Sequence, residues 1–307
     1  MFAPPPRIVA DVAFRLPPHH SKAGQPSAWL TQQRRGAAMG SFLEGPSFDG
    51  AGNLYVVDIP FGRVFRISPQ GHFDVVVQYD GQPNGLKFGP DGAVWITDYQ
   101  RGLLRLDVSS GRLDTVLGAE AHGFVGLNDL FFHGNDCWFT DQGMSGQQAP
   151  YGRVLRWRIG SDHPDVVLQG IPSPNGIVVE PSGHSVLVAV TRANAVWRLP
   201  LMLDGSTAKV GVFVQLSGGF GPDGMALDEQ GNLAVVHAGL GAVWLFSPRG
   251  EPLLRIDSPV APVVTNCAFG GPDRRDLYIT ESDSGVILRA RMPVAGLALG
   301  SAPPSGS

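Results

Sequence analysis

Six short segments of this chain begin with the same chemistry and recur at a nearly constant interval. Each starts with a carboxylate or carboxamide side chain, which we call the anchor residue, and continues into a short, mostly apolar run. The anchor residues are 40, 44, 47, 48 and 43 positions apart along the chain. A repeat of about 40–50 residues built from strands and turns is typical of a β-propeller, in which each repeat forms one blade. The six anchor residues are Glu44, Asn84, Asn128, Asn175, Asp223 and Asn266.

Each repeat also contains further strand-like runs separated by turn residues. After the first segment comes a turn such as 49–52, and then β-branched or aromatic runs such as 54–57 and 63–67. A fourth run is visible in some repeats, as at 72–77. The 41 Gly and 26 Pro among 307 residues leave little room for long helices. We therefore predict an all-β, six-bladed β-propeller with four-stranded blades. It forms a single domain over residues 1–299, followed by a disordered tail at 300–307.

The two ends of the repeat region suggest how the ring closes. The last repeat lacks an outer strand, whereas the N-terminal segment 7–14 has the composition of a strand. We predict that this N-terminal strand completes the last blade, because closure of the ring removes an exposed sheet edge. Segment 15–42, which precedes the first anchor residue, is long for a loop in a compact domain. We expect it to form a lid over one mouth of the central channel, with a disordered excursion as the alternative.

Charge and hydropathy restrict the partners and the location of the protein. The net charge of −4 and the absence of a basic run argue against nucleic acid as a partner. No stretch is long and apolar enough to span a membrane, and the N-terminus has no signal-peptide pattern, so we expect a cytoplasmic protein with no membrane partner. Cys137 and Cys267 lie in different repeats, and we expect them to be buried and unpaired. The sequence alone assigns no oligomeric state.

The anchor residues carry the chemistry that a hard metal ion prefers. If they lie on the innermost strands, the carboxylates of Glu44 and Asp223 face one another in a narrow channel, where they repel unless a cation lies between them. All-oxygen ligation favours calcium first, with magnesium, manganese or zinc as further candidates. The alternative is that Asn-Gly and Asp-Gly pairs are only turn residues. Glu44 favours the metal site, because glutamate has no turn preference.

Three of the anchor motifs carry a family resemblance: residues 43–46 (Leu-Glu-Gly-Pro), 174–177 (Pro-Asn-Gly-Ile) and 222–225 (Pro-Asp-Gly-Met). From about residue 42 to 292 the chain resembles the senescence-marker-protein/gluconolactonase/luciferin-regenerating-enzyme family. The resemblance implies a six-bladed propeller that hydrolyses lactones, often sugar lactones. It also implies that Glu44, Asn175 and Asp223 bind a divalent metal, and that Asn128 binds the metal or the substrate. A related branch cleaves organophosphates at a calcium site.

We therefore predict a metal-dependent lactonase acting on a small-molecule lactone. The ion would be held by Glu44, Asn128, Asn175 and Asp223 and would polarise the lactone carbonyl, while Asp223 acts as general base toward water. The alternatives are a phosphotriesterase-like hydrolase, a non-catalytic propeller that binds a protein partner, and a metal-free condensing enzyme of the strictosidine-synthase type. Side chains expected to contact the substrate are Asn84, Asn128, Asn266, Tyr99 and His237.

Overall fold

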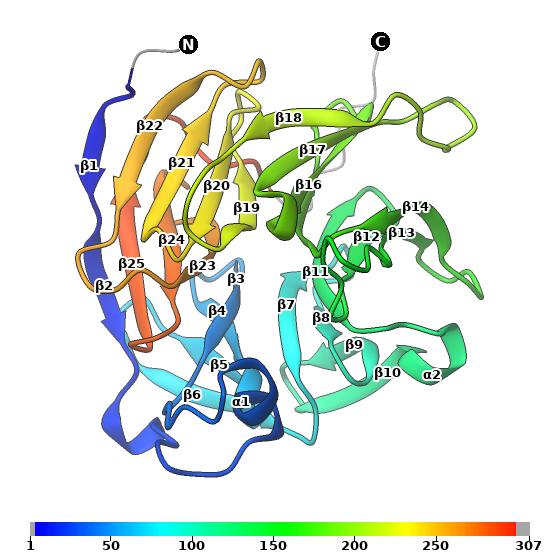
Figure 1. Cartoon of the computed structure of the whole chain (residues 1–307). Helices are drawn as coiled ribbons and strands as arrows, with labels where there is room; N and C mark the ends of the chain where they lie inside the picture. Colours follow the sequence, from blue (N-terminus) through cyan, green and yellow to red (C-terminus); the bar gives the residue numbers. More distant parts are fainter. Residues whose placement is uncertain (1–3, 299–307) are drawn as a thin grey trace.

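Six sheets are arranged around a common centre in the computed structural model, which describes residues 4–298 (Figure 1). Each sheet contains four antiparallel strands, one sheet has an additional fifth strand in parallel, and the innermost strand of each contacts the innermost strands of both neighbours. The predicted all-β, six-bladed propeller with four-stranded blades is therefore confirmed. The tail predicted at 300–307 lies outside the described residues.

Within each blade the chain runs outward from the channel, so the anchor segments form the innermost strands. In blade six the outer strand comes from the N-terminal segment. From the inside outward the strands are as follows: blade one, β3 (Leu43–Phe48), β4 (Leu54–Asp58), β5 (Arg63–Ile67) and β6 (Phe73–Gln78); blade two, β7 (Pro83–Phe88), β8 (Val94–Asp98), β9 (Gly102–Asp107) and β10 (Arg112–Gly118); blade three, β11 (Leu127–His133), β12 (Asp136–Asp141), β13 (Gly152–Arg158) and β14 (Asp165–Ile171); blade four, β15 (Pro174–Val179), β16 (Ser185–Val190), β17 (Ala195–Pro200) and β18 (Gly211–Gln215); blade five, β19 (Gly221–Leu227), β20 (Leu233–Ala238), β21 (Ala242–Phe246) and β22 (Pro252–Asp257); blade six, β23 (Val264–Gly270), β24 (Asp276–Glu281), β25 (Val286–Arg291) and β2 (Asp11–Arg15).

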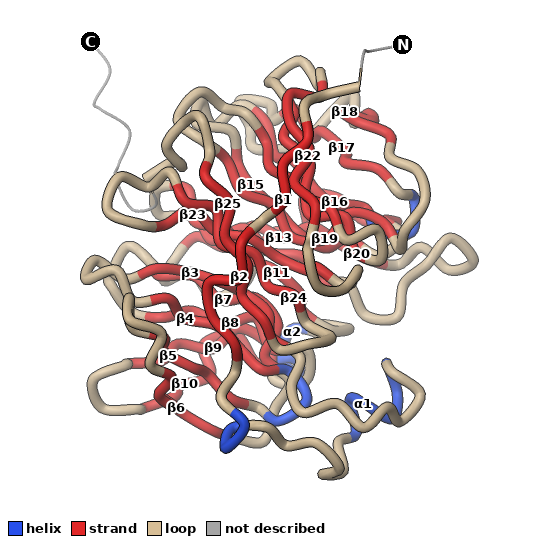
Figure 2. Tube along the Cα trace, turned by 90° about the vertical axis from the view of Figure 1, so that its left-hand side faces the viewer, coloured by secondary structure: helices blue, strands red, loops and turns tan. Residues whose placement is uncertain are grey.

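Among residues 4–298, helical structure is confined to short connections. The two α-helices are α1 (Ala28–Gln33) and α2 (Ala119–His122), and the 3-10 turns are η1 (Pro18–His20), η2 (Ile59–Phe61) and η3 (Thr191–Ala193). Viewed from the side, α1 lies outside the sheets, at one face of the ring (Figure 2). No helix among residues 4–298 is long and apolar enough to cross a membrane.

The N-terminal segment closes the ring in two pieces. Strand β2 pairs antiparallel with β25 and supplies the outer strand of blade six, as predicted. The preceding strand β1 (Arg7–Val9) instead pairs in parallel with β22, as a fifth strand of blade five. Ala10, between them, is buried and donates its N–H to the carbonyl of Asp257 at 3.0 Å. The prediction of one strand over 7–14 is therefore corrected to two strands, which join blades five and six by pairing with one strand of each.

Apolar side chains fill the spaces between neighbouring blades. Val57 and Val64 of blade one pack in one cluster with Leu86 and Ile96 of blade two, and all four are fully buried. Burial of apolar surface between blades is worth roughly 25 cal/mol per Å², so this packing holds the ring together. Cys137 and Cys267 are buried and unpaired, as expected.

The innermost strands approach each other so closely that several positions require glycine. A Cβ atom added to Gly85 would lie 2.8 Å from both the carbonyl oxygen of Asn128 and the Cα of Asp129. One added to Gly45 would lie 2.7 Å from the carbonyl oxygen of Asn84. The Asn-Gly and Asp-Gly pairs thus lie inside strands, not in turns, which excludes the alternative explanation of the repeat.

Threonine hydroxyls fix the anchor segments to the preceding blade. Thr97 donates to the carbonyl oxygen of Asn128 at 2.6 Å, and Thr140 donates to that of Asn175 at 2.7 Å. Both hydroxyls are fully buried, so each bond is shielded from competition by water. These bonds fix the positions of neighbouring anchor residues relative to one another along the axis of the channel.

We predict that Gly85→Ala destabilises the propeller, because the new methyl group would collide with the backbone of blade three. Overpacking of this kind costs about 1–3 kcal/mol. Gly50 is the matched control, since it lies in an exposed turn with no atom within 4 Å of an added Cβ. Thermal unfolding should show a clear decrease in Tm for Gly85→Ala and almost none for Gly50→Ala. Equal Tm values for the two variants would contradict the close approach of the strands.

Candidate functional site

The strand register defines which residue of each blade faces the channel at the same level. In each blade the inner and second strands form a first pair, such as Leu43 with Asp58, and a bulge or irregularity follows a residue or two later. The residue after that first pair is Glu44, Asn84, Asn128, Asn175 and Thr265 in blades one to four and six. In blade five an additional pair, Gly221 with Ala238, comes first, and Asp223 follows the pair of Pro222 with His237. Five anchor residues therefore occupy equivalent positions. The sixth prediction was wrong by one residue, because Val264 pairs with Glu281 and places Thr265 at the anchor level.

Glu44 is a buried carboxylate with several hydrogen-bond partners. Its side chain is 4% exposed, and one oxygen accepts the backbone N–H of Gly45 at 2.8 Å. Burial raises the pKa of Glu44 to about 7, and the nearby charge of Asp129 adds to this; hydrogen bonds from Gly45, Asn266 and Thr265 oppose the shift. A cation placed beside this carboxylate would favour its ionised form.

Asp223 lies within electrostatic range of Glu44, although the two come from blades five and one. Burial, and then the charges of Glu44 and Asp129, raise the pKa of Asp223 well above its usual range. A hydrogen bond from Asn175 and the positive charge of Arg192 act in the opposite direction. The structure thus brings together two of the predicted carboxylates, and they repel each other in the absence of a cation.

The amide of Asn128 is held in one orientation by a chain of hydrogen bonds. Its Nδ2 donates to Oε1 of Gln142 at 3.0 Å, and Nε2 of Gln142 donates to Oγ of Ser173 at 2.9 Å. Because Nδ2 is engaged on this side, the Oδ1 of Asn128 is directed away from Gln142. Asn128 is 4% exposed and Asn175 is 8% exposed, so both amides belong to the wall of the channel. Gln142 was not among the predicted site residues.

Asp129 was not among the predicted site residues, and Asn266 was predicted one position away from where it lies. Both lie one residue beyond the anchor level, where the other four blades have glycine. Each is 2% exposed, and Nδ2 of Asn266 donates across the channel to Oδ2 of Asp129 at 3.4 Å. Burial raises the pKa of Asp129, while the charge of Lys87 lowers it. The missing glycine in repeats three and six was the signal that could have identified both residues.

His237 does not join the carboxylates among the described contacts. Its Nε2 bonds the carbonyl oxygen of Gly218 at 2.9 Å, and Nε1 of Trp244 donates to its Nδ1 at 3.3 Å. The ring is buried, and burial lowers its pKa. Both ring nitrogens are therefore engaged, Nε2 with the loop before β19 and Nδ1 with Trp244 on β21. The predicted contact of His237 with substrate gains no support from this geometry.

Tyr99 lies beside the loop that leads to Asn128. A Cβ atom added to Gly126 would collide with the ring of Tyr99, so glycine is needed there for the ring to pack. Tyr99 and Asn84 are both half-buried at the same mouth of the channel, and their contact with substrate stays a prediction.

Carboxylates at the ends of the second strands organise the loops of this mouth. Asp58 accepts the backbone N–H of Phe42, and Asp98 accepts those of two successive residues in the following loop. Asp141 accepts two N–H groups in the loop before β11 and pairs with Arg153. Their role is to hold loops rather than to bind a ligand, and they keep the mouth in a fixed shape around the anchor residues.

Segment 15–42 contacts distant blades at the face of the ring that carries the anchor residues. Trp29 of α1 packs on Phe42, with ring centroids 4.8 Å apart. Nε2 of Gln33 lies 3.1 Å from the sulfur of Met144 in blade three, and Arg34 forms an ion pair with Asp283 in blade six. The segment thus contains helix and loop that contact blades three and six. Its movement as a lid stays a prediction.

Comparison with known proteins identifies the family. Residues 42–283 match the model of the SMP-30/Gluconolactonase/LRE-like region. The chain belongs to this family. Among curated relatives, it is similar to a gluconolactonase of Zymomonas mobilis (28% identity over 286 residues, covering 81% of this chain and 78% of the relative). It is also similar to lactonase drp35 of Staphylococcus aureus (27% identity over 245 residues, covering 75% and 73%).

Solved structures of similar shape confirm the fold of the family. A calcium-binding regucalcin of Agrobacterium tumefaciens superposes with a TM-score of 0.74 at 23% identity, covering 84% of this chain and 92% of that one. A gluconolactonase of Xanthomonas campestris superposes with a TM-score of 0.72 at 22% identity, covering 82% and 86%. At these identities the likeness is evidence for the propeller architecture alone.

The raised pKa of Glu44 predicts how the stability of the chelator-treated protein depends on pH. A carboxyl group with a higher pKa in the folded state stabilises the fold at low pH and loses that contribution as pH rises through the folded pKa. For Glu44 this window runs from its unfolded value near 4.5 to about 7. We expect the Tm of the metal-free protein to decrease between pH 5 and pH 8. Glu44 contributes at most roughly 3 kcal/mol to this loss in the free energy of unfolding.

Glu44→Gln is the variant that isolates the contribution of Glu44 to this pH dependence, because glutamine has a similar shape and does not titrate. Its Tm should decrease less than that of the wild type over the same pH range, in the presence of chelator. The account is contradicted if both proteins lose the same stability between pH 5 and pH 8.

Proposed function

We propose that this protein is a metal-dependent lactonase that hydrolyses a small lactone at the mouth of its central channel. Membership of a family that includes proteins named gluconolactonase and lactonase supports the reaction class. The observation that carries the proposal is the convergence of Glu44 and Asp223 from blades one and five, each with a pKa raised by burial and by nearby negative charge. Such an arrangement needs a cation to ionise fully at neutral pH.

The donor set fits a hard divalent ion, with calcium as the first candidate. No group of three His, Cys, Asp or Glu side chains within residues 4–298 is placed to hold an ion together. The ligands would therefore be the two carboxylates of Glu44 and Asp223 completed by amide oxygens of Asn128 and Asn175. A set of charged and neutral oxygen ligands is typical of calcium sites, and magnesium and manganese are the next candidates. When bound, the ion would supply a Lewis acid for the lactone carbonyl.

Asp223 is the candidate general base. A carboxylate whose surroundings favour its protonated form accepts a proton from water more readily than an ordinary exposed aspartate does. Asn175 bonds it, and the positive charge of Arg192 lies in range to limit its basicity. The oriented amide of Asn128 would place its oxygen at the reacting end of the site, held by Gln142.

We expect Asp223→Asn to remove lactonase activity and to leave the fold intact. General-base catalysis contributes about 10²–10⁴-fold in rate, so kcat should decrease by at least about 100-fold. Steady-state kinetics on a panel of aldonolactones and simple aliphatic and aromatic lactones would measure this. Circular dichroism and Tm would verify folding.

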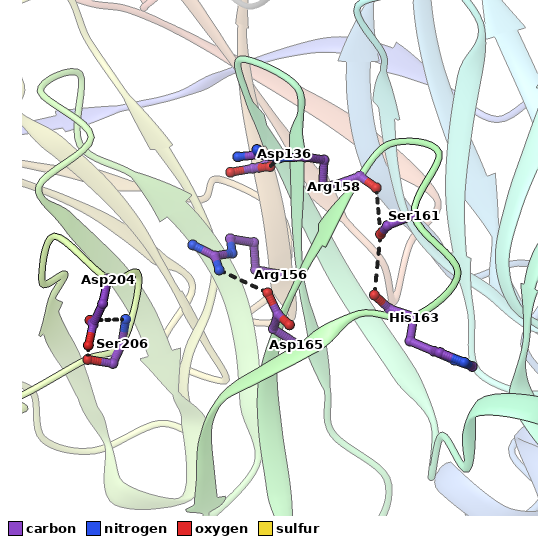
Figure 3. A network of polar contacts seen from close by, with 8 residues as sticks. All are labelled: Asp136, Arg156, Arg158, Ser161, His163, Asp165, Asp204 and Ser206. Atoms are coloured by element: carbon purple, nitrogen blue, oxygen red, sulfur yellow. Dashed lines mark hydrogen bonds and ion pairs between the residues drawn. The ribbon is translucent and has the colours of Figure 1, made fainter.

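Asp165→Asn is the matched control, because Asp165 lies on the outer strand of blade three. It forms a surface ion pair with Arg156 at 2.9 Å, in a polar network remote from the channel (Figure 3). Its loss should change kcat by less than twofold. A folded Asp223→Asn variant with wild-type kcat would refute Asp223 as the base.

A further inference from the structure

Lys87 is a buried lysine in the wall of the channel. It is one of three lysines in the chain, with Lys22 and Lys209. Its side chain is 6% exposed, and its Nζ donates to the carbonyl oxygen of Pro46 at 3.2 Å. An ammonium group has three N–H donors, and a buried one requires negative partners nearby. Lys87 and Gly85 are two residues apart on β7 and so share one face of the strand, and a Cβ atom added to Gly85 would lie 2.8 Å from the Cα of Asp129.

Lys87 lies between the carboxylates and a cavity that opens at the other end of the channel. This cavity, of about 770 Å³, is lined by the turn at 49–52, by Phe131 and Met225, and at its inner end by Lys87 and Cys267. The anchor residues lie at the opposite ends of the same strands. Lys87 therefore borders this cavity while its Nζ is bonded to the carbonyl oxygen of Pro46 in the next blade.

Among the buried groups of the channel, the charges balance only when Lys87 is counted, because Arg192, whose charge acts on Asp223, is exposed to solvent. Glu44, Asp129 and Asp223 carry three negative charges when ionised, whereas one divalent ion supplies two positive charges. Because no three acidic side chains in the described part of the chain are grouped for one ion, Asp129 is not placed to share the ion with both of the others. Lys87 supplies the third positive charge, beside the carboxylate of Asp129, which is not a ligand of the ion.

We propose that Lys87 takes the place of a second cation, so that the channel holds one divalent ion. Removal of the ammonium group then leaves a second oxygen-lined cation site, formed by Asp129, Asn266 and the carbonyl of Pro46. This inference rests on the proposed metal site of Glu44 and Asp223. It assigns to Lys87 a positioning and charge-balancing role, and it concerns the number of ions bound rather than catalysis.

The test is the number of calcium ions bound per chain by the full-length protein. Chelator-treated protein is titrated with calcium chloride by calorimetry, and bound metal is counted after gel filtration. We expect one ion for the wild type and two for Lys87→Met. The double variant Lys87→Met/Asp129→Asn, in which the unbalanced charge is also removed, should return to one. Lys209→Met, an exposed lysine, is the control and should keep one ion.

Each other outcome overturns the proposal. It fails if the wild type binds two ions, if Lys87→Met binds one, or if the double variant still binds two. Should Lys87→Met fail to fold even in calcium, the double variant decides: folding with one ion supports the charge-balance role, and failure to fold contradicts it. A wild type that binds no calcium and opens no lactone would instead contradict the proposed function itself.

Discussion

The close approach of six innermost strands is the constraint on which the rest of the structure depends. Where Gly45 and Gly85 lie, a methyl group would collide with the backbone of the next blade. That proximity closes the ring, and it also brings side chains from blades that are far apart in sequence into one narrow channel. Glu44 and Asp223 come from blades one and five, and the charge of Glu44 raises the pKa of Asp223. The packing of the fold and the electrostatics of the site therefore have one cause.

Burial and repulsion then determine the chemistry that the channel can perform. Three carboxylates in a space of low polarity retain their protons above the usual pH range unless positive charge is provided. The chain provides one such charge itself through Lys87 and leaves the other two for an ion. Neutral amides at Asn128 and Asn175 add oxygen ligands without adding charge. In this account, metal binding, the basicity of Asp223 and the position of Lys87 are parts of one electrostatic balance.

The repeat was sufficient to predict the architecture, because the glycine and anchor pattern is imposed by contacts that every blade makes. It was insufficient wherever a residue's role depends on its neighbour across the channel. Asn266 starts an Asn-initiated segment like the others, yet the pairing of Val264 shifts it by one position. The importance of Asp129 and Lys87 follows only from their mutual proximity. His237 was placed at the correct strand end, but Trp244 and Gly218 take both of its nitrogens.

Metal content measured together with lactonase activity tests the central claim most directly. The protein would be stripped with a chelator, assayed on a lactone panel, and then supplied separately with calcium, magnesium, manganese or zinc. The account predicts that activity disappears with the ion and returns when one equivalent of a single ion, calcium first, is restored. A metal-free protein that retains full activity would contradict it. So would a protein that binds no divalent ion and hydrolyses no lactone under any of these conditions.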